Sequence, residues 1–191
     1  MEKIWLYLSV LLMIVYSISL ILVLFYSLSQ LNLLWNYVQY KKKKEKHPLL
    51  DLTKPESVPF ITIQLPVFNE LYVMERLLKC INQIEYPREK LEVQVLDDST
   101  DESVELTRGL VEDLKIDGLD IVQIRRKNRV GFKAGALKEG LTSAKGEFIA
   151  IFDADFLPQS NWLLQTVSQF ENEEIGIVQT RWSHINRDYS I

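Results

Sequence analysis

Two aspartates separated by a single residue end an apolar run in this sequence of 191 residues. In the stretch IFDADFLP, the apolar residues before Asp153 predict a strand, and Asp155 follows two positions later. Alternate residues of a strand point the same way, so the two carboxylates can face one point. Carboxylate oxygens, completed by phosphate oxygens and water, are the ligands that Mg2+ and Mn2+ prefer. The pair therefore predicts a site for Mg2+ or Mn2+, with a turn before Pro158 as the structural alternative.

The stretch RVGFKAGAL supplies cationic partners for a phosphate. Lys133 lies at a glycine-flanked helix start, where free backbone amides and the helix dipole favour anions. Arg129 lies nearby in the sequence. The phosphate-loop pattern G-x-x-x-x-G-K-[ST] and the dinucleotide pattern G-x-G-x-x-G are both absent. We therefore predict that Lys133 and Arg129 approach phosphate oxygens, with an ordinary surface lysine as the alternative at position 133.

The acidic stretch LDDSTDES could contact the organic part of a ligand. Asp97 and Asp98 could accept hydrogen bonds from a base imide or from ribose hydroxyls. The structural alternative is the start of a helix, because Ser99 and Glu102 have the spacing of a capping box. Both interpretations can hold together, with Ser99 and Asp101 as caps and the two preceding aspartates as ligand contacts.

The elements that must position these residues alternate along the chain. Five strands are predicted at residues 60–66, 91–98, 119–126, 147–155 and 175–182. Four helices are predicted at residues 70–84, 101–118, 130–146 and 158–172, the last with proline in its first turn. This alternation predicts an α/β fold with a mainly parallel sheet, whose ligands bind beyond the carboxyl ends of the strands. Polar clusters follow the first four strands, and we expect them to meet at one edge of the sheet: Glu70, then Asp97 and Asp98, then Arg125, Arg126 and Arg129, then Asp153 and Asp155.

The N-terminal part has a different composition. No charged residue occurs from Ile4 to Tyr40, and about 20 apolar residues suffice to cross a bilayer. We predict a transmembrane helix over residues 1–40, with a signal peptide or a core helix as alternatives. Four lysines, Lys41–Lys44, follow it and predict an external N-terminus with the rest in the cytosol. They could also contact anionic lipid headgroups, although a role in topology alone is favoured.

The composition excludes several classes of protein. Outside the lysine run the soluble part is acidic, within a net charge of −4, which argues against a nucleic-acid-binding surface. The single cysteine, Cys80, excludes an internal disulfide framework and a Cys-based zinc site. His47 and His184 are too far apart in sequence to suggest metal-ligand spacing. We divide the chain into the membrane helix, a basic juxtamembrane linker over residues 41–59, and a ligand-binding domain over residues 60–191.

Four motifs together resemble a known family. LPVFNE, VLDDSTD, RVGFKAGALKEG and IFDADFLP, in this order, are similar to the nucleotide-sugar-binding half of inverting family 2 glycosyltransferases. The resemblance covers about residues 60 to 185 and is strongest to the membrane-bound cellulose-synthase-like branch, which includes the β-mannan synthases. It implies a Rossmann-like GT-A fold, a UDP- or GDP-linked sugar as donor, and a growing glycan as acceptor. The membrane would be an inner, plasma or Golgi-type membrane.

The same resemblance implies roles for individual residues. The nucleoside would contact Glu70 and Asp98, the latter at the base. The diphosphate would lie near Lys133, and Asp153 would lie close to the ribose and the diphosphate. The divalent cation, Mg2+ or Mn2+, would be held by Asp155.

The sequence departs from the family at the acceptor side. Family members supply a catalytic base in a T-E-D or H-E-D motif, which is absent here. Residues 179–182 read QTRW, one residue shorter and earlier than the family's Q-x-x-R-W motif. We therefore expect the catalytic base to lie beyond Ile191. We also expect this chain to bind a nucleotide sugar but not to complete the transfer reaction alone.

Three other functions agree with parts of the sequence. A transferase that loads one sugar onto a lipid phosphate uses the same donor chemistry. A catalytically inactive regulatory subunit agrees with the missing base. A metal-dependent adhesion module is disfavoured, because Asp97-x-Ser99-x-Asp101 departs from the D-x-S-x-S pattern at its third position.

Overall fold

A computed structural model of the protein describes residues 2–42, 49–54, 56 and 58–184. It divides into two compact units, Met1–Lys46 and His47–Ile191. Part of the predicted basic linker, including His47, lies outside the described residues, as does the end of the predicted domain after residue 184.

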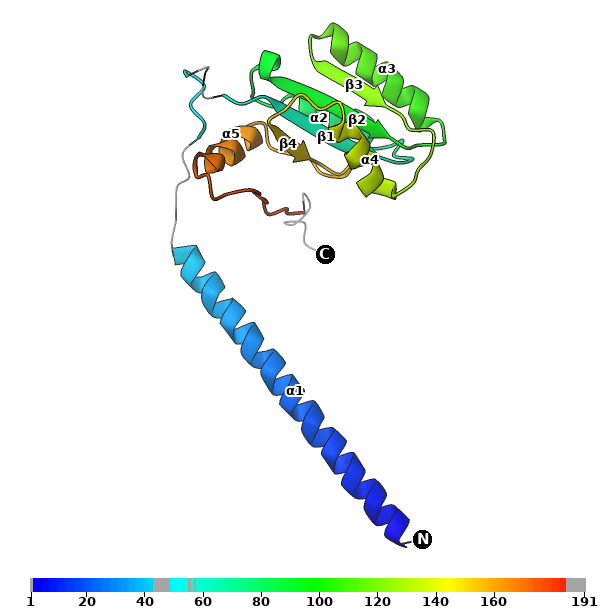
Figure 1. The fold of residues 1–191 in the computed structure, drawn as a ribbon, viewed down its shortest axis with the longest axis vertical. Helices are drawn as coiled ribbons and strands as arrows, with labels where there is room; N and C mark the ends of the chain where they lie inside the picture. The colour runs from blue at the N-terminus through cyan, green and yellow to red at the C-terminus, as the bar shows by residue number, and fades with distance from the viewer. Residues whose placement is uncertain (1, 43–48, 55, 57, 185–191) are drawn as a thin grey trace. The chain divides into compact units, whose positions relative to one another are not determined.

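The first unit is a single long helix. Helix α1 (Glu2–Lys42) contains 41 residues and forms one continuous helix (Figure 1). Its apolar side chains are distributed over all sides of the helix. A helix rises about 1.5 Å per residue, so α1 is much longer than the roughly 30 Å of a bilayer's hydrocarbon core. By length and composition the segment Lys3–Tyr40 could cross a membrane, a test that N-terminal signal sequences also pass.

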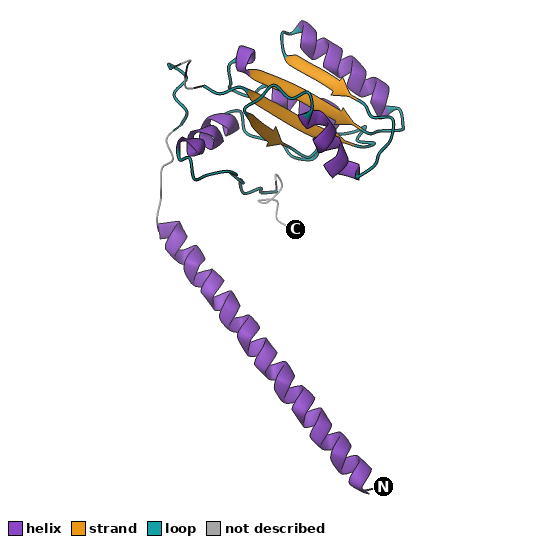
Figure 2. Ribbon diagram, viewed as in Figure 1, coloured by secondary structure: helices purple, strands orange, loops and turns teal. Residues whose placement is uncertain are grey.

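The second unit is built on a parallel sheet. Its strands are β1 (Ile61–Val67), β2 (Leu91–Asp97), β3 (Asp120–Ile124) and β4 (Phe148–Ile151), in the order β3-β2-β1-β4 (Figure 1). Figure 2 shows the strands in orange and the helices in purple. Its helices are α2 (Met74–Asn82), α3 (Ser103–Ile116), α4 (Phe132–Leu141) and α5 (Trp162–Val167). Short 3-10 helices occur at Arg88–Lys90 and Ser168–Glu171. The prediction of an α/β fold with a parallel sheet is confirmed. Because the strand order reverses at β1, the crevice between β1 and β4 is the expected ligand site.

The two faces of the sheet differ in chemistry. On one face, alternate residues of β1 and β2 join α2 in the apolar core, as Ile63, Val93 and Leu77 illustrate. On the face toward α4, the register pairs Thr62 with Glu92 and Gln64 with Gln94. Thr62 Oγ1 donates to Glu92 Oε2 at 2.7 Å, and Gln64 Nε2 donates to Gln94 Oε1 at 3.0 Å. The buried Gln64 Oε1 has no hydrogen-bond partner among the described residues. Helix α4 approaches this face closely, because Gly140 has no side chain to meet the two glutamines.

Three sequence predictions need correction here. Residues 175–182 form no strand. The neighbouring edge strand, β4, is only four residues long and offers little backbone for pairing. The segment is held by a side-chain contact instead, in which Trp162 Nε1 donates to Thr180 Oγ1 at 3.1 Å. Pro158 does not start a helix, because α5 begins four residues later. The core also begins before residue 60, since Leu50 and Val58 are buried in it.

Candidate functional site

A pocket of about 350 Å³ opens at the carboxyl ends of β1, β2 and β4. Six of the seven candidate residues line it, namely Glu70, Asp98, Arg129, Lys133, Asp153 and Asp155. The remaining lining residues are Pro66, Val67, Phe68, Leu96, Ala136 and Ala154. This volume is typical of small-molecule sites, with an apolar floor and a few converging charged groups. The parallel topology thus brings together side chains that are up to 85 positions apart in the sequence.

The aspartate pair lies at the end of β4. Asp153 and Asp155 follow the strand in a turn, where the Phe156 amide donates to the Asp153 carbonyl at 3.0 Å. The Asp155 carboxylate is exposed and has no hydrogen-bond or ion-pair partner within the described part of the chain. No group of three or more His, Cys, Asp or Glu side chains that could hold a metal occurs among the described residues. The two carboxylates fit a hard cation that takes its other ligands from a phosphorylated substrate and water.

Lys133 projects from the first turn of α4 and pairs with Asp153. The turn before it is tight, because Gly131 has a φ of 75° and Phe132 a φ of 48°. Positive φ is unfavourable for a bulky residue such as phenylalanine, and such strain is often found near functional sites. The turn directs the amino end of α4 and its lysine to the pocket, which suits an anion.

Asp98 is held by Arg126, which the sequence placed at this edge of the sheet without giving it a role. Arg126 forms a two-point ion pair with the Asp98 carboxylate, with Nε donating to Oδ1 at 2.9 Å. The same guanidinium donates to the carbonyl oxygens of Val130 at 2.9 Å and Phe132 at 3.0 Å. The hydrogen bond to Asp98 raises the pKa of Arg126, so this cation stays charged. The cluster of arginines after β3 was the only sequence signal for this contact.

Arg129 lies above an aromatic ring at the pocket. Its guanidinium carbon is 3.3 Å from the centre of the Phe68 ring and 5.2 Å from that of Phe132. It also lies 3.8 Å from the Asp98 carboxylate. A planar cation stacked on an aromatic ring provides a flat surface of the kind that nucleobases use.

Asp97 does not reach the pocket. Its buried carboxylate accepts hydrogen bonds from the Ser99 amide at 2.8 Å and from Gln123 Nε2 at 2.6 Å. Because strand residues alternate in direction, Asp97 and Asp98 face different surroundings. Asp97 therefore shapes the turn after β2, while its neighbour lines the pocket.

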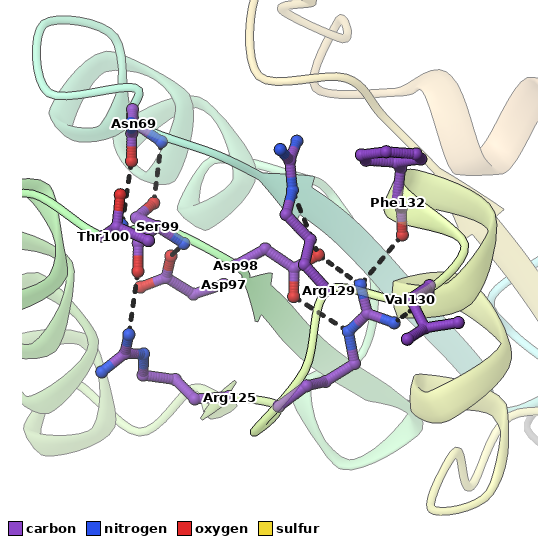
Figure 3. Close-up of polar contacts among 10 residues, drawn as sticks. Asn69, Asp97, Asp98, Ser99, Thr100, Arg125, Arg129, Val130 and Phe132 are labelled. Atoms are coloured by element: carbon purple, nitrogen blue, oxygen red, sulfur yellow. Dashed lines mark hydrogen bonds and ion pairs between the residues drawn. The ribbon is translucent and has the colours of Figure 1, made fainter.

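The predicted capping box of Ser99 and Glu102 is wrong. Ser99 Oγ instead accepts the Asn69 amide at 2.8 Å, and Asn69 Oδ1 accepts the Thr100 amide at 2.9 Å (Figure 3). These bonds join the β1 and β2 ends and hold Asn69 at a φ of 57°. The predicted cap at Asp101 is present, since its Oδ1 accepts the Ser103 amide at 3.1 Å.

The pocket therefore has two chemically distinct ends. The β2 side offers a carboxylate, an aromatic ring and a stacked guanidinium, which suit a planar heterocycle and hydroxyl groups. The β4 side offers a lysine, a helix start and two carboxylates, which suit a phosphate group with a divalent cation.

Comparison with known proteins identifies relatives of this chain. Residues 62–190 match the model of the family described as Glycosyl transferase family 2. The chain is 41% identical over 138 residues to probable glucomannan 4-beta-mannosyltransferase 7 of Oryza sativa subsp. japonica, covering 70% of this chain and 24% of that protein. It is 41% identical over 137 residues to glucomannan 4-beta-mannosyltransferase 1 of the same organism, covering 69% and 26%. The chain thus spans about a quarter of the length of these relatives.

Solved structures share the fold. The mannosyltransferase PcManGT from Pyrobaculum calidifontis, in complex with GDP-Man and Mn2+, matches with a TM-score of 0.62 and 33% identity. The match covers 75% of this chain and 41% of that one. TarS of S. aureus matches with a TM-score of 0.51 and 20% identity, covering 60% and 20%, which supports the fold alone. The expectation of a GT-A-like fold is confirmed.

Proposed function

Because this chain belongs to glycosyl transferase family 2, we propose that its second unit binds a nucleoside-diphosphate sugar with a divalent cation. The donor would serve a membrane-bound enzyme that builds a β-linked polysaccharide on the cytosolic face. The relatives named as glucomannan 4-beta-mannosyltransferases support a polymer as product. The neighbour in complex with GDP-Man and Mn2+ supports GDP-mannose as the first donor to test, with UDP-sugars as the alternative.

One observation carries this proposal, namely that Lys133, Asp153 and Asp155 meet at the β4 side of the pocket. Lys133 would bind the diphosphate of the donor, and the α4 start would add backbone amides. The carboxylates of Asp153 and Asp155 would hold Mg2+ or Mn2+. A cation bound there would neutralise charge on the leaving diphosphate as the glycosidic bond breaks.

The β2 side of the pocket would hold the nucleoside. Asp98 and Glu70 offer acceptors for a base N–H or a ribose hydroxyl, and Arg129 on Phe68 offers a stacking surface. Asp97 would support the nucleoside site indirectly, because its carboxylate accepts hydrogen bonds from the Ser99 amide and from Gln123 Nε2 and so holds the turn after β2. This assignment leaves the sugar ring of the donor to extend from the β4 side.

We assign no catalytic base within the described residues. Inversion requires a base that removes the proton of the acceptor hydroxyl. The proposal places this base, and most contacts with the growing glycan, in the part of the relatives that this chain does not span. The whole transfer reaction is therefore proposed for the longer enzyme type.

The first unit would anchor the enzyme in the membrane. The segment Lys3–Tyr40 of α1 is long and apolar enough to cross a bilayer, and Lys41–Lys44 follow this segment in the sequence. Basic residues next to a span favour the cytosolic side and are attracted to anionic lipid headgroups. A cytosolic second unit would have direct access to nucleotide sugars.

Calorimetric titration of the full chain in detergent tests the donor assignment. We expect GDP-mannose or a UDP-sugar to bind in Mn2+ and to lose most of its affinity in excess chelator. The variant Asp155→Asn should weaken binding in Mn2+ about tenfold or more, because one anionic metal ligand is lost. The matched control is Asp113→Asn, on the exposed surface of α3, which should bind as the unchanged chain does. Equal affinity with and without metal would sink the role given to Asp155.

A further inference from the structure

We propose that Arg126 is a positioning residue that holds the nucleoside side and the diphosphate side of the pocket in one geometry. This inference rests on the proposed function. Arg126 does not line the donor pocket; it lines a neighbouring surface pocket together with other residues of the loop after β3. Its guanidinium joins Asp98, at the end of β2, to the turn that begins α4. Because α4 carries Lys133, one side chain connects both ends of the site.

The contact with Asp98 is desolvated. The side chains of Arg126 and Asp98 are 10% and 7% exposed, and both carboxylate oxygens accept from the guanidinium. A buried two-point arginine–carboxylate pair fixes direction as well as distance. Removing one partner of such a pair is costly, because the other charge is left unpaired. The orientation of Asp98 toward the pocket therefore depends on Arg126.

The other two contacts reach the α4 turn. Arg126 donates to the carbonyl oxygens of Val130 and Phe132, on either side of Gly131. Phe132 has a φ of 48°, a conformation that a bulky residue keeps only when its surroundings impose it. The guanidinium supplies that constraint, since it binds the carbonyl of the strained residue itself.

Lysine cannot replace this arrangement. Four acceptors surround one planar group: two carboxylate oxygens and two carbonyl oxygens. Arginine has five N–H donors in a fixed plane, whereas lysine has three on a single nitrogen. The neighbouring backbone is also close, because a Cβ on Gly135 would lie 2.5 Å from Arg126 Nη1. The site is shaped for a guanidinium.

A positioning role of Arg126 and a purely stabilising role predict different effects of a change at Asp98. If Asp98 restrains the α4 turn through Arg126, then a change at Asp98 must alter the diphosphate side as well. Asp98→Asn should therefore weaken a ligand that has no nucleoside at all. Such long-range loss is not expected if Asp98 acts only on the base and ribose.

The experiment measures binding of two ligands, Mn2+–GDP and Mn2+–pyrophosphate, to the full chain in detergent. We expect Asp98→Asn to weaken both ligands about tenfold, and Arg126→Lys to weaken both by about tenfold to a hundredfold. The double variant should be little worse than Arg126→Lys, because the two residues act as one unit. The control Arg108→Lys, in an exposed pair with Glu105, should leave both affinities unchanged.

Amide hydrogen exchange of residues 130–136 gives a readout that needs no ligand. Both variants should speed exchange in this segment, where the Gly135 amide normally donates to the Gly131 carbonyl at 3.0 Å. Unchanged exchange together with unchanged pyrophosphate affinity in Asp98→Asn would overturn the proposal while leaving the donor site intact. Failure of the unchanged chain to bind either ligand would overturn the proposed function and this inference with it. If Arg126→Lys does not fold, Asp98→Asn decides alone.

Discussion

Lys133 and Asp153, twenty residues apart in the sequence, form an ion pair at the β4 side of the pocket. Their side chains are 53% and 44% exposed, so water screens the pair and it contributes little to folding stability. Both residues also line the pocket. We infer that the pair is exchangeable: Lys133 would turn to the diphosphate and Asp153 to the cation when the donor binds.

The first prediction concerns the charge of Lys133. Lys133→Met should weaken Mn2+–GDP about tenfold to a hundredfold, because a charge-assisted contact with phosphate is lost. The unfolding temperature should hardly change, since the exposed ion pair stabilises the fold little. Calorimetric titrations at low and at high salt should also show that the affinity of Lys133→Met for Mn2+–GDP depends less on salt than that of the unchanged chain. Lys115→Met, in an exposed pair with Glu112, is the matched control. If Lys133→Met bound Mn2+–GDP as tightly as the unchanged chain, the inference that Lys133 turns from Asp153 to the diphosphate would be contradicted.

The second prediction concerns Gly135 in α4. A Cβ at this position would lie 2.0 Å from the Val130 carbonyl oxygen, so the backbone of the turn would have to move. We expect Gly135→Ala to lower the free energy of unfolding by about 1–3 kcal/mol, the usual cost of overpacking. Chemical denaturation measures this directly. In contrast, Gly109 in α3 has no atom within 4 Å of an added Cβ. Gly109→Ala should raise stability by about 0.5–1 kcal/mol, and equal effects of both substitutions would disprove the steric argument.

The sheet edge was predictable from the sequence because topology leaves little freedom. Once strands and helices alternate, the carboxyl ends of parallel strands must meet, and residues such as Glu70 and Asp155 are brought together. The strand predicted at residues 175–182 was wrong for a related reason. Its alternating pattern satisfies β propensity, but a strand also needs a neighbouring edge, which local sequence does not reveal.

The finer division of roles could not be read from residue types. Asp97 and Asp98 are adjacent and identical, and only the register of β2 decides which one faces the pocket. Arg126 and Arg129 lie in one loop, whose path depends on the positive φ of Gly131 and of Phe132. A glycine in a sequence indicates that a positive φ is possible at its position, whereas a phenylalanine does not. The partner of Asp98 therefore became evident only in the folded chain.

The third prediction concerns pH and Tyr86. Its side chain is buried, with the residue 6% exposed, and its hydroxyl donates to the Pro59 carbonyl at 2.7 Å. Burial, followed by the negative charge of Glu147, raises the pKa of Tyr86. The unfolded tyrosine loses its proton near its ordinary pKa of about 10, while the folded one keeps it. The stability linked to this proton is therefore fully present below about pH 10 and is lost as the pH rises further.

Tyr86→Phe isolates this contribution. Near neutral pH the variant should be less stable by about 1 kcal/mol, because the hydrogen bond to Pro59 is lost. Above about pH 10 the difference from the unchanged chain should shrink, by up to about 1.4 kcal/mol for each pH unit. Urea denaturation between pH 8 and 11 tests this trend. Tyr72→Phe, at a residue that is 93% exposed, is the control. A difference that stays constant over this range would refute the linkage.

The fourth prediction concerns the side of the membrane on which the second unit lies. The chain has one cysteine, Cys80, so a single exposed cysteine can be introduced at Tyr72 after Cys80→Ser. Because lysines follow the apolar segment Lys3–Tyr40, we expect a membrane-impermeant maleimide to label Tyr72→Cys in inverted vesicles and to leave it unlabelled in intact bacterial cells. The Cys80→Ser chain alone should take up no label in either preparation.

Changing the lysines tests the cause of this orientation. Replacing Lys41–Lys44 by glutamine leaves the apolar segment Lys3–Tyr40 unchanged but removes four of the five lysines between Tyr40 and His47. The N-terminal flank offers only Glu2 and Lys3. The bias of basic residues sets the orientation of a span, whereas acidic residues contribute little. We therefore expect a fraction of the substituted chains to become labelled in intact cells. Retention of a single orientation would mean that folding of the second unit, rather than the lysines, determines the topology.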